Sequence, residues 1–450
     1  MYVASRVPQA GDAMIIAFWV FLCKDWIVLP SSGTSDGTVA DTVEFTRETA
    51  IAMDEVDPLA GFEERFETPG KPTLYMDGNS LGRIPRDTPQ LLADTLRTWQ
   101  NDFIIAWREW IHLPEQLGDL IASSVVEAKP GEIIVGDSTT VNLYKAAAAA
   151  IGAQTGRRTI VTTDDNFPTD LYVLQSLAAQ HSLTLKIIPA DPIEGLDTAQ
   201  LAETIDEDTA LVCLSHVAYR SGALLDMDTV TRLVHSSGSL ILWDISHSAG
   251  SVPVPLESSG ADLAVGCTYK YLNGGPGAPA FVYVRDSEQA RLRQPIWGWF
   301  GHQNQFAMST EFQPAKGIES FLAGAPSVLS TVAIGPALAD IAEAGIDRLR
   351  VKGKLMTELI VTLSEEWLVP RGFSLASPRD AERRGSHVTL RHPKAKDFVR
   401  GLIAHDVIPD FRPSDMIRFG PAPLYTRFVD VWDALDCLRQ LHDEGIADGA

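Results

Sequence analysis

Short apolar runs rich in β-branched residues alternate with helical patterns through the middle of the chain. The runs cover residues 159–162, 183–188, 210–217, 239–245, 261–267 and 278–284. Stretches such as LVCL and LILW have no polar face, which is typical of parallel strands covered by helices on both sides. The alternation therefore predicts an α/β domain with a mostly parallel central sheet.

Helical patterns precede and follow this central region. The predicted helices cover residues 86–102, 119–128, 143–151, 332–344 and 346–366. Asp119 is the expected N-cap of the second helix. Two later strands are expected near residues 387–390 and 416–419. We therefore expect an N-terminal helical segment, a large domain and a smaller C-terminal α+β domain, covering residues 43–110, 111–325 and 326–450.

The N-terminus carries an apolar run of its own, AMIIAFWVFLC at residues 13–23. This run is too short to span a bilayer. It has the length of a signal-peptide core, but Arg6 is the one basic residue before it, and Asp12 offsets that charge. A polar stretch, GTSDGTVAD, follows. We interpret residues 1–42 as an N-terminal extension, with the fold beginning near Asp41.

The charge and cysteine content of the chain limit the kinds of molecule that it is expected to bind. The 450 residues include 37 Lys and Arg against 59 Asp and Glu, a net charge of −22 that would repel nucleic acid and anionic membranes. A small-molecule substrate is expected instead. The cysteines are scattered without metal-ligand spacing, so neither a disulfide framework nor a metal site is expected, and a cytoplasmic setting fits best. They are Cys23, Cys213, Cys267 and Cys437.

Lys270 stands at the end of a predicted strand, before the glycine-rich turn YLNGGPG. A lysine amine in this position can form an imine with a carbonyl compound, although a strand-end lysine can equally reach solvent. Upstream, Asp244 ends another apolar strand, at the sheet edge where open α/β sheets bind ligands. There it would suit a protonated ring nitrogen, or it would cap the next turn.

Two further motifs suggest a phosphorylated planar ligand. The sequence GDSTTVN at residues 136–142 clusters hydroxyl groups before a helix, which favours a phosphate cradle over an ordinary N-cap. In NFPTD at residues 166–170, Phe167 could cover a planar ring with Asp170 at its edge. Without the other motifs, NFPTD would be interpreted as an ordinary turn.

The candidate phosphate cradle at residues 136–142, Asp244 and Lys270 follow one another in this order along the chain. This order is typical of pyridoxal phosphate (PLP) enzymes of the aspartate-aminotransferase-like fold. The chain resembles the kynureninase family, with matches from Tyr75 to about Tyr425. The motifs that carry the resemblance are MDGNSLG at 76–82, DSTTVNL at 137–143, FPTD at 167–170, WDISHSAG at 243–250, CTYKYLNGGPG at 267–277, GWFGH at 298–302 and RFGPAPLY at 418–425.

The resemblance implies a role for each matching residue. Lys270 would be the imine-forming lysine and Asp244 the partner of the ring nitrogen. Tyr269 is a candidate proton relay only because it lies next to Lys270 in the sequence. The implied cofactor contacts are Thr139, Thr140, Phe167, Pro168, Thr169, Asp170, Ser215, Asp244, His247, Tyr269, Lys270, Trp299 and Ala325. The implied substrate contacts are Arg418, which suits a planar carboxylate, and Ser80, Trp107 and His302. His302 could equally be an ordinary hydrogen-bonded loop histidine.

The implied activity is hydrolysis of L-kynurenine, 3-hydroxykynurenine or a ring-substituted kynurenine to the corresponding anthranilate and L-alanine, by a homodimer. Ala325 stands where the family usually has Thr or Asn. It is either a tolerated variation or a change that makes room for a ring substituent. Another PLP-dependent lyase, such as a C–S lyase, is the alternative, but a desulfurase needs a mobile thiol, and Cys437 lies in a helical pattern. A regulator would be expected to carry a basic DNA-binding module, and none is visible.

Overall fold

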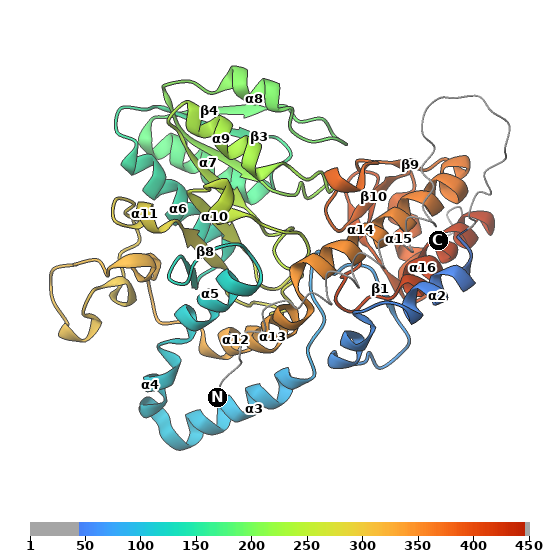
Figure 1. Cartoon of the computed structure of the whole chain (residues 1–450), viewed down its shortest axis with the longest axis horizontal. Coiled ribbons are helices and arrows are strands. Elements are labelled where there is room, and N and C mark those ends of the chain that lie inside the picture. The colour runs from blue at the N-terminus through green and yellow to red at the C-terminus, as the bar shows by residue number, and fades with distance from the viewer. Residues whose placement is uncertain (1–44, 446–450) are drawn as a thin grey trace, which may run out of the picture.

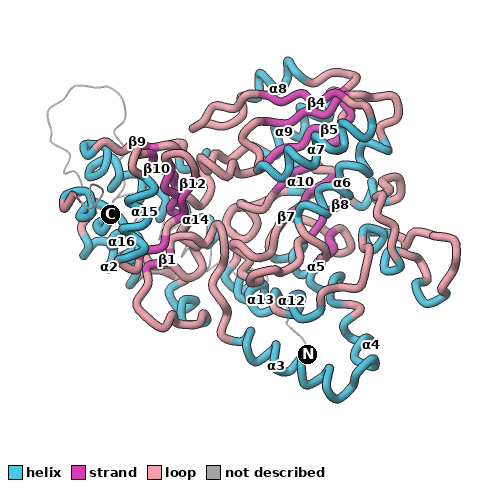
Figure 2. Tube along the Cα trace, turned by 180° about the vertical axis from the view of Figure 1, so that it is seen from behind, coloured by secondary structure: helices cyan, strands magenta, loops and turns pink. Residues whose placement is uncertain are grey.

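The computed structural model describes residues 45–445, and the predicted N-terminal extension lies outside this range. Two groups of strands, separated in space, organise the chain (Figures 1 and 2). The larger group forms one sheet in the order β2-β8-β7-β6-β5-β3-β4. Its strands are β2 (Ile133–Val135), β3 (Thr159–Thr163), β4 (Thr184–Ile188), β5 (Thr209–Ser215), β6 (Leu240–Asp244), β7 (Leu263–Gly266) and β8 (Phe281–Val284).

Only β8 runs against its neighbours in this sheet, because it pairs antiparallel with both β2 and β7. The pairs among β3, β4, β5, β6 and β7 are parallel. The predicted α/β fold with a mostly parallel sheet is thus confirmed. Strand β2, at the sheet edge, was not predicted, because its three apolar residues are too short a run to signal a strand.

The continuous apolar strands bury both of their faces. Val212 and Ile241 pack into one core, together with Val230 of helix α9. Their neighbours Cys213 and Leu242 point the other way, into a second core that helices α6 and α7 complete. The helices around the sheet are α5 (Leu113–Ser124), α6 (Thr139–Ala153), α7 (Pro168–His181), α8 (Thr198–Thr204), α9 (Met227–Ser236), α10 (Leu256–Ser259) and α11 (Asp286–Gln289).

One predicted helix boundary is wrong. Helix α5 begins at Leu113, with Pro114 in its first turn, and ends at Ser124. Asp119 therefore lies inside the helix instead of capping it, and its carboxylate accepts a hydrogen bond of 2.8 Å from the backbone N–H of Gly131. A proline in the first turn of a helix is a stronger start signal than an aspartate, because its fixed φ suits the helix and its missing N–H has no partner to lose.

The smaller group of strands forms an antiparallel sheet in the order β12-β13-β10-β9. The N-terminal part of the described chain joins it: β1 pairs with β11, and the Asp54 carboxylate of α2 accepts hydrogen bonds from the first N–H groups of α16. These elements are α2 (Arg47–Glu55), β1 (Leu74–Tyr75), α14 (Ile346–Leu363), β9 (Ser374–Leu375), β10 (Val388–Arg391), α15 (Ala395–Ala404), β11 (Val407–Ile408), β12 (Asp410–Arg412), β13 (Met416–Phe419) and α16 (Phe428–Asp443).

Further helices connect the two sheets. Helix α3 leads along the edge of the molecule to α4, away from both sheets (Figure 1). The connecting helices are α3 (Asp87–Asp102), α4 (Trp107–Trp110), α12 (Val328–Val332) and α13 (Ile334–Ala344). The short turns are η1 (Ala60–Arg65), η2 (Phe103–Ala106), η3 (Trp299–Gly301), η4 (Gln305–Ala307), η5 (Gly317–Phe321), η6 (Ser364–Leu368), η7 (Val369–Arg371) and η8 (Ala381–Arg383).

Within residues 45–445, no single helix has the length and apolar character needed to cross a membrane. One pair of helical stretches, 328–344 and 346–371, meets these criteria only when the two are joined, and they are bent by 84°.

Candidate active site

A cavity of about 290 Å³ lies at the carboxyl ends of the central strands, between the large sheet and the smaller one. Ser215 ends β5, Asp244 ends β6, and Lys270 follows β7, whereas Arg418 comes from β13 of the smaller sheet. The cavity is lined by Asn79, Ser80, Thr139, Thr140, Phe167, Thr169, Asp170, Ser215, Tyr219, Asp244, Ser246, His247, Tyr269, Lys270, Arg412 and Arg418. Two distant parts of the chain thus form one site.

The Lys270 amine has a histidine as its direct neighbour. Its Nζ lies 2.9 Å from Nε2 of His247. His247 is buried, and burial together with the positive charge of Lys270 lowers the pKa of His247 well below its usual value. An imidazole that stays uncharged can accept a hydrogen bond from the amine, which makes His247 a suitable residue to orient the amine of Lys270.

Two carboxyl groups lie side by side in the lining of the cavity. Asp244 ends β6, and its Oδ1 accepts a hydrogen bond of 2.8 Å from the N–H of Ser246. Asp170, in the first turn of α7, forms a hydrogen bond with Asp244. Burial, followed by the charge of Asp244, raises the pKa of Asp170 well above the ordinary value, which favours a proton on Asp170. Oδ2 of Asp170 has no hydrogen-bond partner among the described residues.

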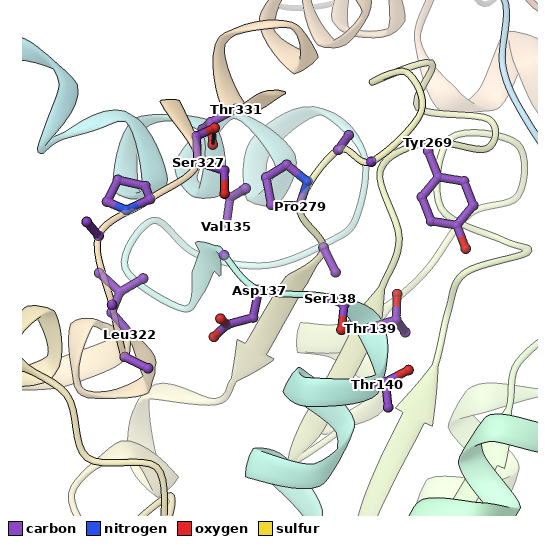
Figure 3. A pocket seen from close by; sticks show the side chains of 18 of the residues that line it. Val135, Asp137, Ser138, Thr139, Thr140, Tyr269, Pro279, Leu322, Ser327 and Thr331 are labelled. Carbon is purple, nitrogen blue, oxygen red and sulfur yellow. Dashed lines mark hydrogen bonds between the residues drawn. The ribbon is translucent and has the colours of Figure 1, made fainter. Parts of the chain in front are cut away.

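The predicted phosphate cradle forms the start of α6. The Ser138 hydroxyl accepts a hydrogen bond of 3.3 Å from the N–H of Val141, which makes Ser138 the N-cap. Thr139 and Thr140 follow in the first turn, with Tyr269 beside them (Figure 3). Hydroxyl groups at the free N–H groups of a helix form a site for an anion.

An ion pair between a buried lysine and a more exposed aspartate lies next to this cradle. Lys145 is 1% exposed, and its Nζ donates to Asp137 Oδ2 at 2.7 Å and to the carbonyl of Phe321 at 2.6 Å. Asp137 directly precedes the N-cap and has a φ of 50°, in the left-handed region. Lys145 was not predicted as a functional residue, because a single lysine within a helical pattern has no distinctive signal.

Aromatic side chains form the wall near the lysine. The rings of Phe167 and Tyr219 meet edge to face with their centroids 5.3 Å apart, and Nζ of Lys270 lies 5.9 Å from the centroid of Phe167. Phe167 is the N-cap residue of α7, and Pro168 occupies its first turn. A planar ring held beside the lysine amine would therefore lie against Phe167.

Arg418 occupies the opposite end of the cavity and is only 1% exposed. Its Nη2 donates to the Ser80 hydroxyl at 3.2 Å and lies 2.6 Å from Asp410 Oδ2, while Nη1 donates to the carbonyl of Tyr219. Nε of Arg412 lies 2.7 Å from the same Asp410 oxygen. This end of the cavity therefore holds a fixed guanidinium suited to a planar carboxylate.

Several residues that the sequence grouped with the site lie outside this cavity in the single chain. Trp107 packs against Phe300, with ring centroids 6.0 Å apart. Trp299 is 45% exposed. Ala325 lines a neighbouring cavity of about 500 Å³, which shares Thr139, Thr140 and Tyr269 with the first. His302 lines a third cavity of about 280 Å³.

Other residues line the main cavity but were missed by the sequence analysis. They are Asn79, Tyr219, Ser246 and Arg412. Asn79 and Ser246 lie within the motifs DGNS and WDISH. Because other residues of these motifs were predicted to be at the site, these two could have been predicted as well. Tyr219 and Arg412 lie in a loop and at the end of a short strand, where no pattern distinguishes them from ordinary surface residues.

Comparisons with known proteins agree with one another. Residues 349–438 match the model of the kynureninase C-terminal domain. A kynureninase from Burkholderia pseudomallei is 41% identical over 405 residues, covering 88% of this chain and 96% of the relative. A kynureninase from Pseudomonas fluorescens is 40% identical over 407 residues, with the same coverage of 88% and 96%.

Solved structures confirm the fold. A cysteine desulfurase from Thermococcus onnurineus superimposes with a TM-score of 0.72 at 18% identity, covering 83% of this chain and 95% of that one. A C-DES variant described with glycine covalently linked to its PLP cofactor has the same TM-score of 0.72 at 18% identity, covering 86% and 99%.

The cavity also fits PLP on its own chemistry. It joins a helix-end anion site, a lysine amine beside a neutral histidine, and a carboxyl group whose buried Oδ2 has no partner within the described chain. These features suit, in turn, a phosphate, an aldehyde, and a polar atom at the edge of a ring. Together with the identity to kynureninases along nearly the whole chain, they show that this chain belongs to the kynureninase family of PLP-dependent enzymes.

Proposed function

We propose that this enzyme hydrolyses L-kynurenine, or a ring-substituted kynurenine, to the corresponding anthranilate and L-alanine. Water adds to the side-chain carbonyl, and the bond between the β and γ carbons breaks. The observation that carries the proposal is a single cavity that unites the Lys270 amine, the Asp244 carboxylate and the Arg418 guanidinium. The relatives named kynureninase support the same reaction.

The cofactor would be held by residues from three motifs. Thr139 and Thr140 would bind the phosphate, Phe167 would cover the ring, Asp244 would pair with the ring nitrogen, and Lys270 would bind the aldehyde. When bound, PLP supplies an electron sink for the bonds around the amino-bearing carbon. The raised pKa of Asp170 favours a proton on that carboxyl group, which would reduce the repulsion between the two aspartates beside the ring nitrogen.

The chain's own groups would bind the substrate and move its protons. Arg418 and Ser80 would grip the α-carboxylate. The Lys270 amine would carry the proton of the α-carbon, and neutral His247, 2.9 Å away, would hold that amine in place by a hydrogen bond. Burial raises the pKa of the Tyr269 phenol, which therefore stays protonated and would act as a proton donor near the substrate carbonyl.

A homodimer would complete the site. Large apolar side chains are exposed in the segment from α3 to η2 and in the loop around η3 and η4: Trp99, Phe103, Ile104, Ile105, Trp297, Trp299, Phe306 and Met308. Exposed apolar patches of this kind mark interfaces. In a dimer, Trp107, Trp299, His302 and Ala325 could contact the cavity of the second copy. Cys213, Cys267 and Cys437 form no disulfide, which supports a cytoplasmic setting.

The lyase alternative shares the fold with the solved desulfurases. A desulfurase needs a thiol nucleophile, and no cysteine is among the described residues that line the cavity. Cys437 lies in α16, where burial raises the pKa of its thiol. A raised pKa keeps the thiol protonated and unreactive at neutral pH.

A product assay tests the proposal. Purified holoenzyme would be given L-kynurenine, 3-hydroxykynurenine and ring-methylated kynurenines side by side, and anthranilates and L-alanine would be measured. Equal rates would remove the idea that Ala325 enlarges the pocket. Release of sulfide from cysteine without any anthranilate would overturn the proposed hydrolysis.

A matched pair of lysine variants tests the residue that carries the proposal. Lys270→Ala should abolish turnover and the cofactor absorbance band near the visible edge. Lys129→Ala, which removes a lysine whose side chain is 60% exposed, should leave both unchanged.

A further inference from the structure

Four charged side chains meet at the arginine end of the cavity, two of each sign. Arg418 and Arg412 both approach the same oxygen of Asp410, at 2.6 and 2.7 Å. The fourth is Asp77, whose carboxyl group interacts electrostatically with both guanidinium groups and with Asp410. No step of the proposed reaction uses Asp77 or Asp410.

Asp77 is connected to Arg418 by two short side chains. The amide of Asn79, with its oxygen facing Arg418, accepts from Nη2 at 3.2 Å and donates to Asp77 Oδ1 at 3.2 Å. The Ser80 hydroxyl accepts from the same Nη2 at 3.2 Å and hydrogen-bonds to Asp77. Because Asn79 is fully buried, this connection has little room to rearrange. Asp77 therefore orients the guanidinium without touching it.

The charges of this cluster balance only while no substrate is bound. Two guanidinium groups offset the carboxylates of Asp77 and Asp410. The carboxylate of an amino acid bound at Arg418 adds a third negative charge next to side chains that are largely buried, where repulsion is stronger than in water. A proton taken up by one carboxyl group would restore the balance.

We propose that Asp77 is a positioning residue for the substrate carboxylate, which holds Arg418 through Asn79 and Ser80 and takes up a proton when an amino acid binds. Burial, followed by the charge of Asp410, already raises the pKa of Asp77 to about 6. The inference rests on the proposed function, because it assumes that Arg418 receives the carboxylate.

The groups around Asp77 leave it as the one that changes charge near neutral pH. Tyr75 on β1 and Tyr271 beyond β7 both interact with Asp77, but burial raises the pKa of each phenol, so both stay neutral. Arg412 and Arg418 face it from the smaller sheet and stay charged, as guanidinium groups do in proteins. Asp410, the remaining neighbour, is held between these two cations.

The proposal predicts a specific pH dependence. Below about pH 6, Asp77 is already protonated, and amino acid binding takes up no further proton there. Above that pH, binding must recruit the proton from solvent, which weakens the affinity by up to about tenfold per pH unit. Asp77→Asn removes the proton uptake while keeping the size and one hydrogen-bond acceptor of the side chain.

The test compares the holoenzyme with Asp77→Asn and with a control variant, Asp415→Asn. Asp415 lies in the turn before β13, and pairs with Arg391 instead of a cavity residue. L-Alanine, the amino acid product, serves as the probe, and its Kd is followed by the change in cofactor absorbance between about pH 5 and pH 8. Using the ratio of wild-type to variant Kd cancels the pH dependence of the alanine amine.

For Asp77→Asn this ratio should stay flat below about pH 6 and rise above it by up to about tenfold per pH unit, whereas for Asp415→Asn it should stay flat throughout. Calorimetry in two buffers should show less proton uptake for Asp77→Asn than for wild type. A ratio for Asp77→Asn that does not change with pH would overturn the proposal.

Two further measurements keep the outcomes separate. If Asp77→Asn does not fold, calorimetry on the wild type alone still decides. L-Alanine should then take up more protons than the decarboxylated amine of L-kynurenine, and equal uptake would overturn the proposal. Binding of L-alanine with the expected proton uptake, but without turnover of any kynurenine, would contradict the proposed function and leave the role of Asp77 standing.

Discussion

The raised pKa of Asp170, next to Asp244, leads to a quantitative prediction about stability. Asp170 is 3% exposed, and its pKa is raised well above the unfolded value of about 3.9, first by burial and then by the charge of Asp244. The folded protein therefore binds one proton more than the unfolded chain in the range between these two pKa values. Because the folded state holds that extra proton, stability falls as the pH rises through this range.

The magnitude follows from that single proton. One extra proton in the folded state costs about 1.4 kcal/mol per pH unit, or about 2.7 kcal/mol over two pH units between the unfolded and the folded pKa. Asp170→Asn keeps a neutral side chain that can donate to Asp244, but it has no proton to hold. The variant should therefore gain about that much free energy of unfolding relative to wild type over these two pH units.

Urea-induced unfolding of the cofactor-free protein at several pH values measures the difference. The free energy of unfolding of the Asp170→Asn variant minus that of wild type should rise with pH at about 1.4 kcal/mol per unit. Asp228→Asn, which changes a side chain that is 49% exposed, is the control and should give a difference near zero at every pH. If the difference for Asp170→Asn is also independent of pH, the folded protein does not bind the extra proton at Asp170, and the reasoning is refuted.

Two substitutions test how the N-terminal segment is held. Lys352 and Asp57 form an ion pair of 2.7 Å with both side chains only 2% exposed, so Lys352→Met should lower the free energy of unfolding by about 3–5 kcal/mol in thermal or urea unfolding, and an unchanged stability would contradict this. A Cβ at Gly82 would lie 2.5 Å from the backbone oxygen of Lys270, so Gly82→Ala should displace the lysine loop and raise the Kd for PLP, whereas Gly61→Ala, with nothing within 4 Å, should not.

The sequence could predict the sheet side of the site because a simple geometric rule applies there. Parallel strands end at the same edge, so residues that follow separate apolar runs must meet. Ser215 and Asp244 are direct partners across β5 and β6, although 29 positions separate them in the chain. Lys270 follows the next strand, β7, which pairs with β6. Their convergence follows from the apolar runs alone.

No such rule applied to local boundaries or to loops. The start of α5 depended on Pro114, whose signal competed with that of Asp119, five residues later. Tyr219 reaches the cavity from a loop, and its carbonyl meets Arg418 across a sequence separation of 199 residues. Its role comes from a tertiary contact between residues far apart in the sequence. Neither periodicity nor turn chemistry can predict such a contact.

The motif DGNS can be recognised in the sequence, but the role of its residues can be understood only from the fold. Its residues have no helical or strand periodicity, and Gly78 bonds to the backbone of Gly420 at 2.9 Å, beside the end of β13. This anchoring lets Ser80 meet an arginine 338 positions later in the chain. In its proposed role, Asp77 holds Arg418 through Asn79 and Ser80, so the spacing of the residues in DGNS determines whether that connection forms. An insertion between Asp77 and Ser80 would break that connection even if every side chain were kept.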